Sequence, residues 1–136
     1  MLPTPDPATT LSTENPALRR TIAVGDAEMA YIDIGEGDPI VFLHGNPTSS
    51  FLWRNVVPHV DGMGRIVVPD FIAHGHSSTS PGDAYHYKDN IAYFDAFFEA
   101  LELTKNVTLV LHDWGAAVGF YRAARFPEQI RGIAYI

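Results

Sequence analysis

Four short apolar runs separated by helical patterns constrain the fold of this chain more than any other feature of its sequence. The runs cover residues 40–43, 66–68, 107–111 and 132–136, and they are mostly continuous and rich in β-branched residues. Strands that are buried on both faces of a sheet have this pattern. Strands that alternate with helices form right-handed crossover units and therefore a parallel sheet. The sequence predicts an α/β fold with a mostly parallel sheet flanked by helices.

Further elements complete this pattern. Residues 20–24 and 28–34 flank a Gly-Asp pair and predict the two strands of a hairpin at the start of the sheet. The clearest helical pattern covers residues 87–103, and shorter helices are expected after Ser50 and over residues 114–125. In the longest helix, apolar side chains recur every three or four positions, at Ile91, Phe94, Phe98 and Leu101.

The two ends of the chain differ from its middle. Residues 1–18 are rich in Pro, Thr and Ala without periodicity, and we expect them to form a flexible tail. Residues 19–136 are expected to form the N-terminal part of a core domain. The last run reaches Ile136 with no polar closing segment, and a carboxylate is costly inside a sheet. We therefore expect the chain to be truncated after its sixth strand.

Composition limits the classes of partner. The 136 residues are 46% hydrophobic and contain no cysteine, which favours one globular domain over a disordered chain or a disulfide scaffold. Nine Lys and Arg against sixteen Asp and Glu argue against a nucleic-acid partner. No apolar run is long enough to span a membrane, and the N-terminus lacks the features of a secretory signal. A soluble, cytoplasmic protein is expected.

Candidate functional residues follow three of the predicted strands. Ligands of open parallel sheets bind at the carboxyl ends of the strands. Residues 44–47, 70–77 and 112–115 occupy these positions. In the last segment a strand passes directly into a helix of small residues, which predicts a strained turn that exposes Asp113. The helix dipole and its free N–H groups favour an anion at that turn.

These strand ends carry three motifs. They read Leu43-His44-Gly45-Asn46-Pro47-Thr48-Ser49-Ser50, Pro69-Asp70-Phe71-Ile72-Ala73-His74-Gly75-His76-Ser77 and His112-Asp113-Trp114-Gly115. Together they resemble the haloalkane dehalogenases of the α/β-hydrolase fold, in the branch with an Asn/Trp pair that binds halide. The likeness covers residues from about 16 to 136. His-Gly-x-Pro is common to many α/β-hydrolases, whereas Asn46 together with Trp114 is far more specific.

The chemistry of these residues agrees with the resemblance. Displacing a halide from saturated carbon needs a charged nucleophile, and the intermediate that forms must be one that water can hydrolyse. Asp113 would form an ester, which water cleaves, whereas Ser would form a stable ether. The indole N–H of Trp114 and the amide of Asn46 are donors suited to a departing halide. Small halogenated alkanes, halide and water are thus the expected partners in a detoxifying reaction, without cofactor or metal.

The resemblance implies further roles that residue types alone do not establish. The backbone N–H groups of Asn46 and Trp114 would form an oxyanion hole while water attacks the ester. The catalytic acid and base would follow residue 136, so residues 1–136 alone are not expected to turn over. A complementary C-terminal segment or chain would then be a partner.

Other functions and simpler roles stay open at this stage. The alternatives are an epoxide hydrolase, a coelenterazine-type luciferase on the same scaffold, and a non-catalytic fragment. Asp113 could be only a helix N-cap, Asn46 a turn residue and Trp114 a core residue.

The remaining polar residues are expected to be structural. Asp70 should hold its loop by hydrogen bonds, and His44 and His112 should orient backbone around the site. The histidines His74, His76 and His86 are too weak a pattern for a zinc site. Relatives more often carry Gly where Ala73 stands, so Ala73 suggests a position that does not require positive φ.

Overall fold

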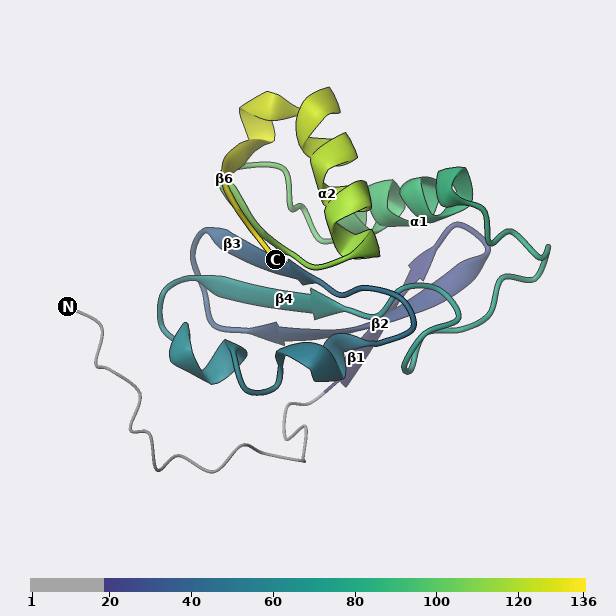
Figure 1. The fold of residues 1–136 in the computed structure, drawn as a ribbon, viewed down its shortest axis with the longest axis horizontal. Coiled ribbons are helices and arrows are strands. Elements are labelled where there is room, and N and C mark those ends of the chain that lie inside the picture. The colour runs from purple at the N-terminus through teal and green to yellow at the C-terminus, as the bar shows by residue number, and fades with distance from the viewer. Residues whose placement is uncertain (1–18) are drawn as a thin grey trace.

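The computed structural model describes residues 19–136, so the tail predicted for residues 1–18 lies outside the described residues. Its six strands form one sheet with helices on both sides (Figure 1). The strands are β1 (Arg19–Val24), β2 (Ala27–Ile34), β3 (Pro39–Leu43), β4 (Arg65–Pro69), β5 (Val107–Leu111) and β6 (Ile130–Tyr135). The helices are η1 (Ser50–Trp53), η2 (Val57–His59), α1 (Tyr87–Ala100), α2 (Trp114–Arg125) and η3 (Pro127–Gln129), where η marks a 3₁₀-helix.

The strand order is β1-β2-β4-β3-β5-β6. The pairs β1–β2 and β2–β4 are antiparallel, and the remaining pairs are parallel. The predicted opening hairpin is therefore confirmed, as is the mostly parallel sheet that follows it. Gly25 makes the tight hairpin turn with a φ of 63°.

The two faces of the sheet carry separate apolar cores. Helices α1 and α2 cover one face, and the segment with η1 and η2 covers the other (Figure 1). Strand β3 shows why its run is continuously apolar: Val41 and Leu43 pack under α1 and α2, whereas Phe42 packs against Trp53 of η1 with ring centroids 5.2 Å apart. Successive side chains of a strand point to opposite faces, so both need apolar residues.

Helix boundaries differ from the sequence predictions. The predicted helix over residues 87–103 ends at Ala100, because Glu102 has a φ of 56° and Leu103 N–H turns back to the Phe98 carbonyl at 2.8 Å. The segment after Ser50 forms two short 3₁₀-helices instead of one α-helix. Pro58 lies in the second and lacks the N–H that a longer helix would need.

An ion-pair cluster around the buried Arg122 joins the two α-helices. The Arg122 side chain is 2% exposed and donates to Asp95 at 2.8 Å and to Gln129 at 2.9 Å. Arg125 donates to both carboxylate oxygens of the same Asp95. Asp95 thus holds two guanidinium groups and fixes α2 against α1.

The connections between the strands diverge at the carboxyl edge of the sheet. From β3 the chain passes to η1 on one face, whereas the connections from β4 to α1 and from β5 to α2 run on the other face (Figure 1). Ligands of open α/β sheets bind where neighbouring connections diverge in this way. No helix in residues 19–136 has the length and apolar character needed to cross a bilayer.

Candidate active site

Asp113 occupies the turn between β5 and α2 in a strained conformation. Its φ of 53° and ψ of −123° lie outside the regions that non-glycine residues normally adopt. Gly115 N–H donates to the His112 carbonyl and Ala116 N–H to the Asp113 carbonyl, both at 2.9 Å, so α2 begins directly after the turn. The strained turn predicted from the sequence is present, and it leaves Asp113 exposed.

Gly115 lets this turn press against the end of β3. A Cβ at this position would overlap the Leu43 carbonyl oxygen and lie 2.6 Å from the His44 carbonyl oxygen. Only glycine fits so close an approach, and the contact fixes the start of α2 relative to the β3 loop.

Two backbone N–H groups hold the Asp113 carboxylate. Asn46 N–H donates to Oδ1 at 3.1 Å, and Trp114 N–H donates to the same carboxylate. Both bonds stabilise the charged form and hold the pKa of Asp113 below its ordinary value, the bond from Asn46 most. Gly45 leaves the space for this side chain, because a Cβ there would overlap the Asp113 Cβ. Asp113 is therefore an exposed, ionised carboxylate with a fixed orientation.

His44 joins the β3 loop to the β4 loop. Its Nδ1 donates to the Gly45 carbonyl at 2.7 Å, and its Nε2 accepts from Phe71 N–H at 2.9 Å. Burial lowers the pKa of His44 to about 4, so its ring is neutral and able to accept that bond. The orienting role predicted for His44 is confirmed. For His112 the structure shows no such role, since its ring Nδ1 is buried without a hydrogen-bond partner among residues 19–136.

Asp70 organises the loop that follows β4. Its side chain is 1% exposed, with Oδ1 accepting from Ser50 N–H at 2.6 Å and Oδ2 from His76 N–H at 2.9 Å. The structural role predicted for Asp70 is thus confirmed.

The prediction for Ala73 is wrong. Its φ is 63°, the left-handed conformation that glycine adopts most easily. The loop imposes this conformation through bonds on both sides: Ala73 N–H donates to the Ser78 carbonyl and His74 N–H to the Phe71 carbonyl, both at 2.9 Å. Alanine adopts it at a modest cost in free energy, and residue identity alone could not exclude it.

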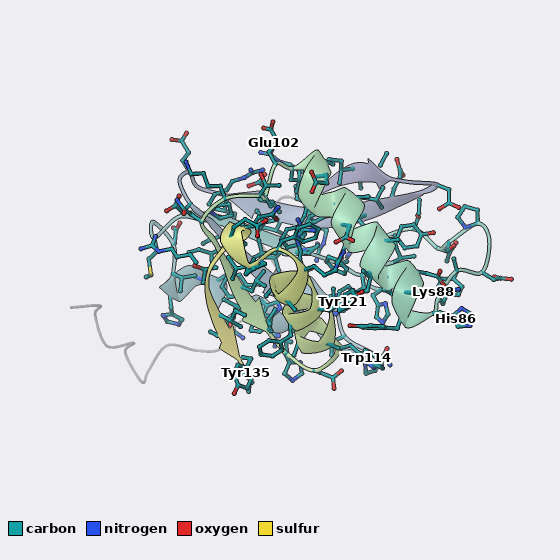
Figure 2. The ribbon with its side chains drawn as sticks, turned by 90° about the horizontal axis from the view of Figure 1, so that it is seen from above. His86, Lys88, Glu102, Trp114, Tyr121 and Tyr135 are labelled. Atoms are coloured by element: carbon teal, nitrogen blue, oxygen red, sulfur yellow. The ribbon has the colours of Figure 1, made fainter. Side chains whose placement is uncertain are left out.

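A pocket of about 280 Å³ opens where these loops meet. Asn46 and Trp114 both line it, together with the aromatic residues Phe71, Tyr85 and Tyr87. Trp114 is 50% exposed, which argues against a core role, and its ring centroid lies 5.8 Å from that of Tyr87. Figure 2 shows Trp114 at the same end of the helical layer as His86 and Lys88, which mark the start of α1. The pocket is thus mostly apolar, with Asp113 adjoining two of the residues that line it.

The three histidines whose pattern is too weak to predict a zinc site, His74, His76 and His86, have different partners. His86 caps α1 with Asp89, and His76 lies 3.8 Å from Asp70. His74 lines the pocket, and its Nε2 lies 3.0 Å from Asn46 Oδ1. Sequence reasoning missed this contact because 28 residues separate the two side chains. Among residues 19–136 no three His, Cys, Asp or Glu side chains are arranged to hold a metal ion.

A strained residue exposed at a sharp turn from a parallel strand into a helix is a feature of the α/β-hydrolase fold. The family model for the α/β-hydrolase fold matches residues 38–136, and the chain belongs to this family.

Within this family, the chain is similar to haloalkane dehalogenases. Haloalkane dehalogenases from Sphingobium indicum and Mycolicibacterium smegmatis are 49% and 50% identical to it over 121 and 116 residues. These matches cover 87% and 83% of this chain but 41% and 37% of the relatives. The crystal structure of the haloalkane dehalogenase DatA from Agrobacterium tumefaciens superposes with a TM-score of 0.82 at 42% identity, covering 87% of this chain and 40% of that one. The chain thus spans about 40% of the length of the haloalkane dehalogenases to which it is similar. These comparisons do not support a separate complementary chain as a partner.

Proposed function

We propose that this protein hydrolyses haloalkanes to an alcohol and a halide ion through an ester on Asp113. One observation carries the proposal: the Asp113 carboxylate is held by two backbone N–H groups beside an apolar pocket lined by Asn46 and Trp114. The similarity to haloalkane dehalogenases supports the same reaction.

In the first step, a carboxylate oxygen of Asp113 attacks the carbon that bears the halogen. The new bond between oxygen and carbon forms as the carbon–halogen bond breaks, and the halide leaves with the bonding electron pair. Because the pKa of Asp113 is lowered, the carboxylate is charged at neutral pH and needs no base to activate it. The hydrogen bond from Asn46 N–H to Oδ1 orients it.

The departing halide needs donors where its charge develops. The indole N–H of Trp114 is a donor without acceptor capacity, and this half-exposed residue lines the pocket. The amide N–H₂ of Asn46 would be the second donor. Both residues line the pocket, whose aromatic walls suit an alkyl chain.

In the second step, water attacks the carboxyl carbon of the ester and cleaves it to the alcohol. Negative charge develops on the carboxyl oxygen, where the N–H groups of Asn46 and Trp114 would stabilise it. From the resemblance we expect the base that takes the proton from water to follow the matched region. Residues 1–136 alone should therefore form the ester without repeated turnover.

The test is bromide release from 1-bromoalkanes by the protein translated from its complete reading frame. We expect release by the wild type and none by Asp113→Asn, because a neutral amide is a poor nucleophile. Parallel assays with a terminal epoxide and with coelenterazine separate the other activities of this scaffold. Epoxide opening or light emission without bromide release would overturn the proposal.

A further inference from the structure

The imidazole of His74 faces the side-chain amide of Asn46 at the edge of the pocket. His74 Nε2 lies 3.0 Å from Asn46 Oδ1, and both residues line the pocket. The inference drawn from this pair rests on the proposed function, in which the Asn46 amide donates to the halide.

The ring of His74 is held in place from several directions. Its Nδ1 lies 3.0 Å from the Ile72 carbonyl oxygen. The ring also packs against His44 and Phe71, with centroid distances of 5.5 Å and 6.0 Å. The left-handed Ala73 just before it turns the chain so that His74 reaches the pocket. His74 therefore presents Nε2 to Asn46 in a preorganised direction.

Proton positions follow from these contacts. The Ile72 carbonyl can only accept, so Nδ1 of His74 carries a proton. A neutral imidazole has one N–H, which would leave Nε2 as an acceptor facing an oxygen that is also an acceptor. The arrangement with Asn46 Oδ1 toward Nε2 is a hydrogen bond only when the ring is an imidazolium. A neutral ring would instead attract the amide N–H₂ of Asn46.

We propose that His74 is a positioning residue that, as an imidazolium, donates from Nε2 to Asn46 Oδ1 and so leaves the amide N–H₂ free to bind halide. Loss of the Nε2 proton turns the amide and withdraws this donor. The imidazolium also places a positive charge near the departing anion. Halide affinity should therefore depend on the protonation of His74.

Other ionisable groups surround His74 and define the controls. His44 stays neutral over the working range because burial lowers its pKa to about 4. The remaining groups on the packed elements are Asp70 and His76 in its own loop, Tyr85 before α1, Tyr87 in its first turn, and His112 and Asp113 after β5. Since His76 and His112 are imidazoles as well, a pH effect belongs to His74 only if it disappears on substitution of His74.

The experiment measures bromide binding to the full protein by the change in tryptophan fluorescence, because Trp114 lines the pocket. Sodium bromide is titrated at constant ionic strength at about pH 5 and at about pH 8. We expect the wild type to bind bromide about tenfold more tightly at the acidic end, the effect of one aligned donor to an anion. His74→Leu should bind about tenfold more weakly than the acidic wild type at every pH, without the pH step.

Two further variants separate positioning from general damage. His74→Gln has a side-chain amide that can donate to Asn46 at any pH, so it should restore much of the affinity without the pH step. His76→Leu changes a neighbouring histidine whose side chain is 63% exposed, and it should keep the wild-type profile. If either His74 variant retains the pH step, the proposal is overturned.

Asn46→Ala distinguishes this proposal from the function on which it rests. If Asn46→Ala leaves bromide affinity unchanged, Asn46 is not a halide ligand and the proposed halide site itself fails. If Asn46→Ala weakens binding while His74→Leu keeps the wild-type affinity and profile, only the role of His74 is refuted.

Discussion

Gly45→Ala tests the close fit between the β3 loop and the nucleophile. The added Cβ would overlap the Asp113 Cβ and lie 2.8 Å from Asp113 Oδ1. Rotating the side chain of Asp113 cannot relieve the first overlap, because its Cβ is bonded directly to the backbone. The strained turn or the β3 loop must therefore move.

The size of this movement sets the expected effect. A carbon and an oxygen in contact are about 3.4 Å apart, so Oδ1 must move by about 0.6 Å or more. The hydrogen bond from Asn46 N–H, now 3.1 Å long, would then lie outside good geometry. Misplacement of a reacting group by about 1 Å can cost about 100-fold in rate. We expect bromide release to fall by about that factor, and the free energy of unfolding by about 1–3 kcal/mol.

The assay is the first-turnover burst of bromide release, measured with the free energy of unfolding of the same samples. Gly82→Ala is the matched control, since no described atom lies within 4 Å of its added Cβ. A folded Gly45→Ala protein whose burst rate stays within twofold of the wild type would refute the reasoning.

Three further predictions concern the halide donor, the buried histidine and the ion-pair cluster. Trp114→Phe keeps an aromatic ring but removes the indole N–H. We expect kcat for bromide release to fall by about 10²–10³-fold, the usual effect of losing one hydrogen-bond donor to the transition state. A decrease of less than tenfold would argue against Trp114 as a halide ligand. For His44 the folded pKa of about 4 lies below its unfolded value of 6.5, so its contribution to stability is complete above pH 6.5 and is lost as the pH falls toward 4. The free energy of unfolding should fall by about 2 kcal/mol between pH 7 and pH 5 from this group, and denaturant titrations of His44→Gln should lack that component. Asp95→Ala leaves the buried Arg122 guanidinium without its main partner and should lower the free energy of unfolding by about 3 kcal/mol, whereas exposed Asp61→Ala should change it little.

Much of the fold follows from local patterns. The continuous apolar runs of β3 and β4 predicted buried strands, and the two cores on opposite faces of β3 show the physical reason. For the run over residues 132–136 this prediction is wrong among the described residues: it lies in β6 at the edge of the sheet, where Tyr135 is 68% exposed. The strained turn at Asp113 could also be predicted, because a strand that enters a glycine-containing helix without a loop leaves few backbone conformations at the junction.

Other features depend on how the loops and helix ends fold, which the residue types at those positions do not signal. The positive φ of Ala73 is set by bonds within the folded β4 loop, and no residue type at that position signals it. The end of α1 at Ala100 depends on the turn at Glu102, which an apolar pattern continuing to Leu101 and Leu103 conceals. The pairing of His74 with Asn46 needs two loops folded onto one pocket, so only the structure reveals it.

Mass spectrometry of the peptide that contains Asp113 tests the central claim most directly. The protein is mixed with a 1-bromoalkane, quenched with acid within the first turnover and digested. We predict a mass increase of one alkyl group on Asp113, reached together with release of one bromide per protein. An unmodified Asp113 in a folded sample that has released bromide, or an alkyl group on another residue, would contradict the account.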